Sequence, residues 1–274
     1  MKYNGPNQSV LEAFGVSGEP TRLAGGQGTC YLLNEIVFKP TNDITEASWV
    51  ADVYNDLVCD QFRVPKPIRT KDNLWVFDGW TASEFVEGDH DDSDYADAVE
   101  ISKIFHKALV GIPKPTFFDN RNNVWAVADR IAWGELPIPD FELTNEPLQK
   151  IFSLLKENEL PNQLVHGDWG AGNILFSSKL GPAILDFSPY WRPADFAIPI
   201  MIIDALVYEG ADESIIDLCK DIQCPDQLFL RAIARRICEY VGHQNHVEND
   251  RDRSEDIIKY INIIDTVIDR VEKL

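Results

Sequence analysis

Residues 164–176 read LVHGDWGAGNILF, a stretch in which two apolar runs flank a loop with three glycines. The pattern predicts a strand, a loop and a second strand. The loop carries His166, Asp168 and Asn173, and a third apolar run ends at Asp186. Two carboxylates and an amide should therefore lie on neighbouring strands and the loop before them. Because Mg²⁺ prefers such oxygen ligands together with phosphate oxygens, the stretch predicts a site that holds a metal against phosphates.

The spacing is that of phosphoryl transfer, with an Asp base, an Asn five residues later and a metal-binding Asp on the next hairpin. The stretch resembles the aminoglycoside phosphotransferase and choline-kinase-like family of small-molecule kinases, which writes its catalytic loop His-Gly-Asp-x-x-x-x-Asn. The resemblance implies Asp168 as the catalytic base, with Asn173 and Asp186 as Mg²⁺ ligands. It implies that His166 braces the loop. The alternative is a turn between core strands in which Asp168 and Asn173 cap backbone groups.

The same resemblance implies an α+β, two-lobed protein-kinase-like fold. Residues 1–86 would form a nucleotide-binding lobe around a small antiparallel sheet, and residues 87–274 a mainly helical lobe for catalysis and acceptor binding. Residues 84–88 resemble the hinge of this family, where the Glu84 carbonyl and the Val86 amide would contact adenine. The alternative is an edge strand that simply leaves the sheet. The last helix is expected over about residues 255–273, where isoleucines recur at helical spacing.

A glycine cluster lies between a short predicted strand and a predicted hairpin that ends in Lys39. Glycines let successive backbone N–H groups approach phosphate without side-chain obstruction, although such clusters are also common in turns. The resemblance assigns Lys39 to the α- and β-phosphates, whereas a lysine at a sheet end is otherwise a solvated residue. The loop residues expected to bind nucleotide are Gly25, Gly26, Gln27, Gly28 and Thr29.

An amphipathic helix is predicted from residue 43 to about residue 58, and Glu46 falls on its inner face. A carboxylate on a buried face requires a cation, and the resemblance pairs Glu46 with Lys39. A second interpretation is open, because Asp43 followed by Glu46 is related to the capping box that starts helices.

Asp195 has two interpretations as well. The resemblance implies that it holds the catalytic loop by hydrogen bonds, whereas a carboxylate at a helix start is favoured by the helix dipole alone. Asp129, Arg130 and Trp133 are either buried scaffold or part of an acceptor pocket, and the sequence leaves both open.

Composition limits the partners of the chain. The 274 residues contain 25 Lys and Arg against 45 Asp and Glu, a formal net charge of −20. This charge argues against nucleic acid as a partner and is compatible with a cationic acceptor. The sequence contains no run of eighteen apolar residues and no apolar N-terminal leader, so we expect no membrane partner. Five scattered cysteines favour free thiols in a cytoplasmic protein.

The sequence therefore predicts a phosphotransferase that moves the γ-phosphoryl group of ATP or GTP, with Mg²⁺, to a hydroxyl of a small molecule. The alternative is a pseudokinase or regulatory protein that binds nucleotide without phosphotransfer. The presence of Lys39, Asp168, Asn173 and Asp186 together favours the enzyme. Neither the acceptor nor the choice between ATP and GTP can be deduced from the sequence.

Overall fold

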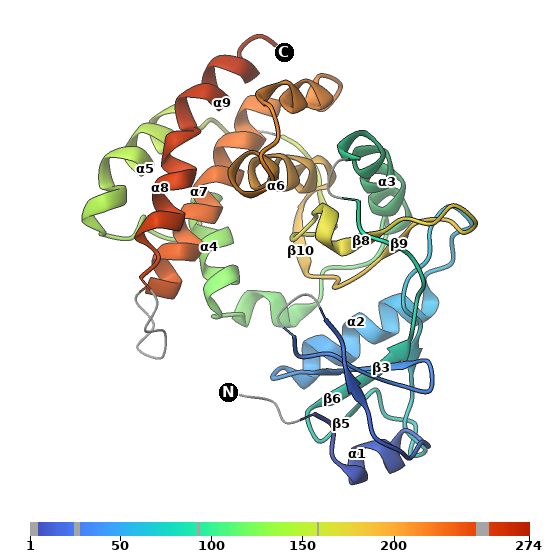
Figure 1. The fold of residues 1–274 in the computed structure, drawn as a ribbon. Helices are drawn as coiled ribbons and strands as arrows, with labels where there is room; N and C mark the ends of the chain where they lie inside the picture. Colours follow the sequence, from blue (N-terminus) through green and yellow to red (C-terminus); the bar gives the residue numbers. More distant parts are fainter. Residues whose placement is uncertain (1–4, 25–27, 92–93, 158, 245–251) are drawn as a thin grey trace. The chain divides into compact units, whose positions relative to one another are not determined.

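The computed structural model describes most of the chain and divides into two compact units (Figure 1). The described ranges are residues 5–24, 28–91, 94–157, 159–244 and 252–274. Unit 1 comprises Met1–Asp91 and Gly172–Phe187, and unit 2 comprises Asp92–Ala171 and Ser188–Leu274. Residues 172–187, which we expected in the second lobe, group with the first unit in the structure.

Unit 1 is built on an antiparallel sheet in which the strand order is β1-β2-β3-β6-β4, with β5 paired to β6. Its strands are β1 (Thr21–Arg22), β2 (Tyr31–Leu33), β3 (Ile36–Pro40), β4 (Pro67–Ile68), β5 (Val76–Phe77) and β6 (Trp80–Glu84). Asn34 and Glu35 join β2 to β3, and both have positive φ angles, 49° and 63°, as a two-residue hairpin turn requires. The predicted hairpin before Lys39 is therefore confirmed.

Two helices belong to unit 1. Helix α1 (Gln8–Ala13) buries Val10 and Leu11 against Phe38 and Trp80 of the sheet. Helix α2 (Ile44–Asp56) buries Ala51, Val53 and Tyr54. Helix α2 ends at Asp56, two residues before the predicted end near residue 58, because Leu57 is extended.

A second hairpin explains why residues 172–187 join unit 1. Strands β8 (Ile174–Leu175) and β9 (Ala183–Ile184) pair with each other, and each also pairs with the first part of the chain. The N–H of Asp89 donates to the Phe176 carbonyl at 2.9 Å, and the N–H of Ile184 donates to the Arg63 carbonyl at 2.9 Å. Residues 172–187 thus belong to unit 1 because their backbone bonds residues of the first part of the chain, although they directly follow the catalytic loop in sequence.

Unit 2 is mainly helical. Its helices are α3 (Tyr95–Ala108), α4 (Val124–Ala132), α5 (Glu142–Leu154), α6 (Ala197–Asp204), α7 (Pro225–Gln244), α8 (Ser254–Asn262) and α9 (Ile264–Val271). Shorter helical segments are η1 (Thr116–Asn120), η2 (Ala171–Asn173, shared with unit 1), η3 (Ala194–Phe196), the π-helical η4 (Ala205–Glu209) and η5 (Glu213–Cys219). The predicted single last helix is instead divided at Ile263, where ψ is −6°.

Helix α7 is the centre of unit 2, packing against α4, α5, α6, α8 and α9 (Figure 1). A two-stranded ladder completes this unit: β7 (Asn162–His166) pairs antiparallel with β10 (Pro189–Pro193), so that His166 lies opposite Pro189. The catalytic loop predicted from sequence begins where β7 ends. Within the described residues, no helix is long and apolar enough to cross a membrane.

Candidate active site

Lys39 and Asp186 meet in unit 1 although 147 positions separate them. Lys39 lies on the exposed side of β3, and its Nζ is 2.7 Å from Asp186 Oδ1. The two side chains are 46% and 54% exposed, so their ion pair contributes little stability, about 0–1 kcal/mol. Because the ion pair is weak, Lys39 can leave Asp186 to bind an anionic ligand.

Asn173 and Asp186 are placed by the β8–β9 hairpin. Ile174 pairs with Ile184, and the Leu185 N–H donates to the Asn173 carbonyl at 2.9 Å, so Asp186 follows one residue beyond the partner of Asn173. Asp186 has a positive φ of 48°, a conformation uncommon outside glycine and tolerated best by Asn and Asp. Carboxylate and amide oxygens are of the hard type that Mg²⁺ takes together with phosphate oxygens, and the role of these two residues as metal ligands stays a prediction.

Of the predicted glycine loop, Gly25, Gly26 and Gln27 lie outside the described residues. Gly28 has a φ of 61°, and its carbonyl accepts from Arg22. Thr29 leads into Cys30, the residue before β2. Because Tyr31 pairs with Phe38, Cys30 lies beside Lys39. Burial raises the pKa of the Cys30 thiol, and the charges of Lys39 and Asp186 act on it in opposite directions, so the described end of the loop lies next to the ion pair.

Glu46 lies in the first turn of α2 and is half-buried. Asp43 caps this helix, accepting from the Glu46 N–H at 2.9 Å. The Asp43 N–H donates to the Thr41 hydroxyl at 3.2 Å, which takes the place that Glu46 would have in a capping box. The start of the helix is thus as predicted, while the pairing of Glu46 with Lys39 stays a prediction.

Glu84 and Val86 lie at the end of β6 and just beyond it. The Glu84 N–H donates to the Lys66 carbonyl and the Phe85 N–H to the Glu35 carbonyl, both at 2.8 Å. The segment thus remains bonded to the sheet up to Phe85 and leaves it afterwards. This course is shared by the hinge and by a plain edge strand, so the contact with adenine stays a prediction.

The catalytic loop begins in unit 2 with a buried histidine pair. The His166 N–H donates to His106 Nε2 at 3.0 Å. His106 Nδ1 therefore carries the proton and donates to the Ser102 carbonyl at 2.7 Å, and burial lowers the pKa of His106 to about 3. His166 Nδ1 in turn accepts from the Asp168 N–H at 3.2 Å. His166 thus links the strand to the loop, in line with the brace implied by the resemblance.

Asp168 follows in unit 2, while Asn173 falls in unit 1. Asp168 Oδ1 accepts from Arg236 of α7 at 3.0 Å. Burial alone would raise the pKa of the Asp168 carboxyl, but the charge of Arg236 and its hydrogen bond, helped by His166 and Arg235, lower it to about 2. Asp168 is therefore a carboxylate throughout the neutral range.

Gly167 is required by a close approach of Tyr190. A Cβ on Gly167 would lie 2.1 Å from Cδ2 of the Tyr190 ring, which is buried and covered by the guanidiniums of Arg121 and Arg235 at 4.8 and 4.3 Å. The Gly167 carbonyl also accepts from Arg235 at 2.6 Å. The loop backbone is thus fixed at Gly167, the residue before Asp168.

We expect Gly167→Ala to lower the free energy of unfolding by about 1–3 kcal/mol, because the buried Tyr190 ring must move. The matched control is Gly170→Ala in the same loop, where a Cβ meets nothing within 4 Å and the change should stay within about 0.5 kcal/mol. Urea unfolding of both variants measures the difference. Equal stability of the two would contradict the close packing against Tyr190.

Asp195 differs from the expectation drawn from the resemblance. It lies in η3, ahead of α6, and its carboxylate accepts from the backbone N–H of Gln223. Burial raises its pKa, and the Gln223 bond and the Lys103 charge oppose that rise. The expected bond from Asp195 to the catalytic loop is not among the contacts of the described residues. Its position at a helix start agrees with the other interpretation.

The residues that sequence reasoning missed are Arg235 and Arg236, which perform the bracing expected of Asp195. Both are buried in α7 and bond the loop through Gly167 and Asp168. A signal was present: two consecutive arginines interrupt an apolar run at residues 232–238 of a predicted helix. At least one such arginine must face inward and find a carboxylate or a carbonyl.

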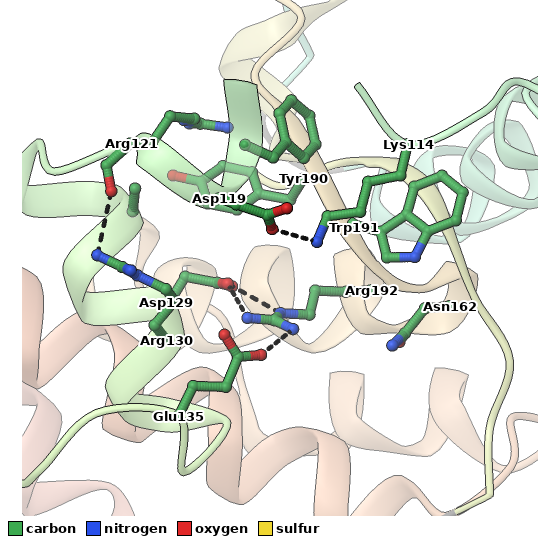
Figure 2. Close-up of a pocket in the computed structure, with 12 residues that line it drawn as sticks. Lys114, Asp119, Arg121, Asp129, Arg130, Glu135, Asn162, Tyr190, Trp191 and Arg192 are labelled. Carbon is green, nitrogen blue, oxygen red and sulfur yellow. Dashed lines mark hydrogen bonds and ion pairs between the residues drawn. The ribbon is translucent and has the colours of Figure 1, made fainter. Parts of the chain in front are cut away.

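For Asp129, Arg130 and Trp133 the sequence left scaffold and acceptor pocket open, and both interpretations stay open, since Asp129 and Trp133 make internal contacts while Asp129 and Arg130 line a cavity. Asp129 is 4% exposed and accepts from Arg192 Nε at 2.8 Å, and the guanidiniums of Arg192 and Arg231 lie 4.9 and 4.6 Å from the centre of the Trp133 ring. Asp129 also lines a cavity of about 350 Å³ in unit 2 together with Arg130. Figure 2 shows Arg192 reaching toward both Asp129 and Glu135 in this cavity, near the ion pair of Lys114 and Asp119.

Comparison with known proteins assigns the chain to a family. The sequence model of the phosphotransferase enzyme family (APH) matches residues 42–197, which include the catalytic loop and Asp186. The chain belongs to the phosphotransferase enzyme family. The chain is a small-molecule phosphotransferase. No curated protein matches the chain in sequence.

Solved structures of phosphotransferases share the fold. Spectinomycin phosphotransferase APH(9)-Ia, in complex with ADP and spectinomycin, aligns with a TM-score of 0.62 at 14% identity, over 99% of this chain and 100% of that one. Amicoumacin kinase hAmiN, in complex with AMP-PNP, Ca²⁺ and Ami, aligns with a TM-score of 0.60 at 13% identity, over 92% of this chain and 88% of that one. The GDP complex of aminoglycoside 2′-phosphotransferase-IIIa aligns with a TM-score of 0.59 at 14% identity, over 93% of this chain and 95% of that one. The predicted α+β kinase-like fold is confirmed.

Proposed function

We propose that this phosphotransferase moves the γ-phosphoryl group of ATP or GTP to a hydroxyl of a small molecule. The observation that carries the proposal is the Lys39–Asp186 ion pair at 2.7 Å. It joins the residue expected on the phosphates to the residue expected on the metal, across 147 positions of sequence. Asn173, the residue before β8, belongs to the same unit, and its carbonyl accepts from the N–H of Leu185, the residue before Asp186.

In the proposed reaction the acceptor oxygen forms a bond to the γ-phosphorus while the bond from that phosphorus to the β,γ-bridging oxygen breaks. The electron pair of the broken bond leaves with the nucleoside diphosphate, and the acceptor proton passes to the Asp168 carboxylate. Because the pKa of Asp168 is lowered to about 2, this carboxylate is a weak base. Proton transfer therefore occurs late, after the acceptor oxygen has become acidic, as a loose transition state allows.

Asn173 and Asp186 would hold Mg²⁺, since their oxygens fit its preference for few hard ligands beside phosphate. The ion would neutralise charge on the phosphates. Lys39 and the backbone amides of the glycine loop would stabilise the charge that develops on the nucleotide as the phosphoryl group leaves. Glu84 and Val86 would bind the base of the nucleotide through backbone groups, and Glu46 would orient Lys39.

We propose that the acceptor carries at least one amino group beside its hydroxyl. A net charge of −20 favours a cationic acceptor, and structures of this fold have been solved with spectinomycin and with kanamycin. The test is nucleotide consumption with ATP and GTP in a screen of amino-alcohols, aminoglycosides, amino sugars and nucleosides. Nucleotide binding with no phosphorylated product from any acceptor class would favour a regulatory, non-transferring protein instead.

We expect ATP or GTP together with Mg²⁺ to raise the melting temperature, because a ligand that binds only the folded state stabilises it by mass action. At 100 times the dissociation constant the gain is about 2.7 kcal/mol. Differential scanning fluorimetry with nucleotide, then with excess chelator, measures the gain and its loss. The prediction fails when neither nucleotide shifts the melting temperature at millimolar concentration.

A further inference from the structure

One buried arginine of unit 2 serves three carboxylates, and Asp168 is one of them. Arg236 donates to Asp168 Oδ1 at 3.0 Å, to Asp204 Oδ1 at 3.1 Å and to Glu239 Oε2 at 2.8 Å. Each of the three guanidinium nitrogens, Nε, Nη1 and Nη2, therefore donates to at least one carboxylate. Arg236 lies on α7 and Asp204 at the end of α6, 68 and 36 residues beyond Asp168.

The three carboxylates differ in exposure. The side chain of Glu239 is 6% exposed and that of Asp204 is 24% exposed, whereas that of Asp168 is 50% exposed. Asp204 also accepts from the Tyr260 hydroxyl at 2.7 Å, and Glu239 accepts from Arg235 at 2.8 Å. Asp204 and Glu239 therefore hold the guanidinium of Arg236 in place. Asp168 is the most exposed of its three carboxylate partners.

The loop itself supplies no cation near Asp168. The residues from Gly167 to Gly172 contain no lysine or arginine, so the positive charges beside the carboxylate come from α7. Arg236 is the one that bonds it, and Arg235 bonds the Gly167 carbonyl just before it. A planar guanidinium held at all its nitrogens orients its partner more firmly than a mobile lysine would.

We infer that Arg236 is the positioning residue of the phosphotransfer reaction, keeping Asp168 ionised and oriented toward the acceptor hydroxyl. This inference rests on the proposed function, in which Asp168 is the base. Correct orientation of a catalytic group accounts for large factors in rate because small displacements are costly. The charged and titratable groups facing Asp168 or its arginine are His166, Asp204, Arg235, Arg236, Glu239 and Tyr260.

The first test is the ionisation of Asp168, measured by carboxyl ¹³C NMR with the signal assigned by its loss in Asp168→Asn. The wild-type carboxyl should not titrate above pH 4, since its pKa is lowered to about 2. In the double variant Arg236→Gln/Asp204→Asn, the midpoint should rise by roughly 1–3 pH units, because burial remains while the charge and the hydrogen bond of Arg236 are removed. The double change avoids leaving Asp204 charged without its arginine.

The second test is the rate with the acceptor found by the screen. Arg236→Lys keeps the charge and should keep Asp168 ionised. A lysine ammonium, however, cannot reproduce the planar set of N–H donors with which the guanidinium bonds three carboxylates. We expect kcat to fall roughly tenfold or more through misorientation, with nucleotide affinity unchanged. In the double variant the rate should also fall as the pH drops through the raised pKa of Asp168. The matched control is Arg270→Gln, which removes an arginine of α9 that pairs with the exposed Asp217; it should change neither kcat nor the titration of Asp168.

An unchanged Asp168 titration in the double variant, or a wild-type kcat in Arg236→Lys, would overturn the inference. If the double variant does not fold, the kcat of Arg236→Lys alone decides whether Arg236 positions Asp168. Failure of the proposed function is distinguishable, because it would be seen as full turnover by Asp168→Asn or as absence of nucleotide binding by the wild type. When Asp168→Asn is inactive and the Arg236 variants behave as wild type, only the positioning role is rejected.

Discussion

Asp168→Asn is expected to lose phosphotransfer while nucleotide affinity stays within about twofold of wild type. Asparagine preserves the shape of the side chain and can still accept from Arg236, but it cannot take the acceptor proton. General-base catalysis typically contributes 10²- to 10⁴-fold to rate, so turnover should fall by about that factor. The residues expected to bind nucleotide, Lys39, Asn173 and Asp186, all lie in the other unit.

The measurement is isothermal titration calorimetry with Mg²⁺ and a non-hydrolysable nucleotide, beside steady-state rates with the screened acceptor. Asp186→Ala is the comparison, because it removes the proposed metal ligand and should weaken nucleotide binding. An Asp168→Asn protein that loses nucleotide affinity as severely as Asp186→Ala would refute this division of labour. Retained turnover would reject Asp168 as the base.

The parts of the site that could be predicted are those whose sequence patterns are contiguous in the chain. The strand, loop and strand around His166 and Asp168 could be predicted because the apolar runs and glycines are contiguous in sequence. The β2–β3 hairpin before Lys39 was predictable for the same reason. The capped start of α2 was predicted from two residues three positions apart.

What sequence reasoning missed depends on contacts between distant residues. Arg235 and Arg236 bond the loop from 68 positions away, and periodicity alone shows only that they interrupt an apolar helix. The grouping of residues 172–187 with unit 1 depends on backbone bonds to Arg63 and Asp89, which no local pattern encodes. The carboxylate of Asp195 accepts from the backbone of Gln223, a contact that the sequence did not predict, and its role as a brace of the loop stays a prediction.

Lys39→Met is expected to weaken nucleotide binding strongly while leaving stability nearly unchanged. Hydrogen bonds to charged groups are worth about 1.5–3 kcal/mol, which is roughly 10- to 150-fold in affinity. The ion pair that Lys39 makes with Asp186 is about half-exposed, so its loss should cost at most about 1 kcal/mol of folding free energy. An affinity loss without a stability loss is what a ligand-binding lysine predicts and a structural one does not.

Glu46→Gln, singly and together with Lys39→Met, then tests whether Glu46 orients this lysine. If the two side chains act as a pair, their losses in nucleotide affinity will be non-additive. Asp43→Ala is the control for helix α2, because Asp43 caps it; it should cost about 0.5–2 kcal/mol of stability and leave nucleotide affinity unchanged. Since Thr41 rather than Glu46 receives the Asp43 N–H, Glu46→Gln should not reproduce that loss. Strict additivity in affinity would reject the pairing and leave Asp186 as the residue that orients Lys39.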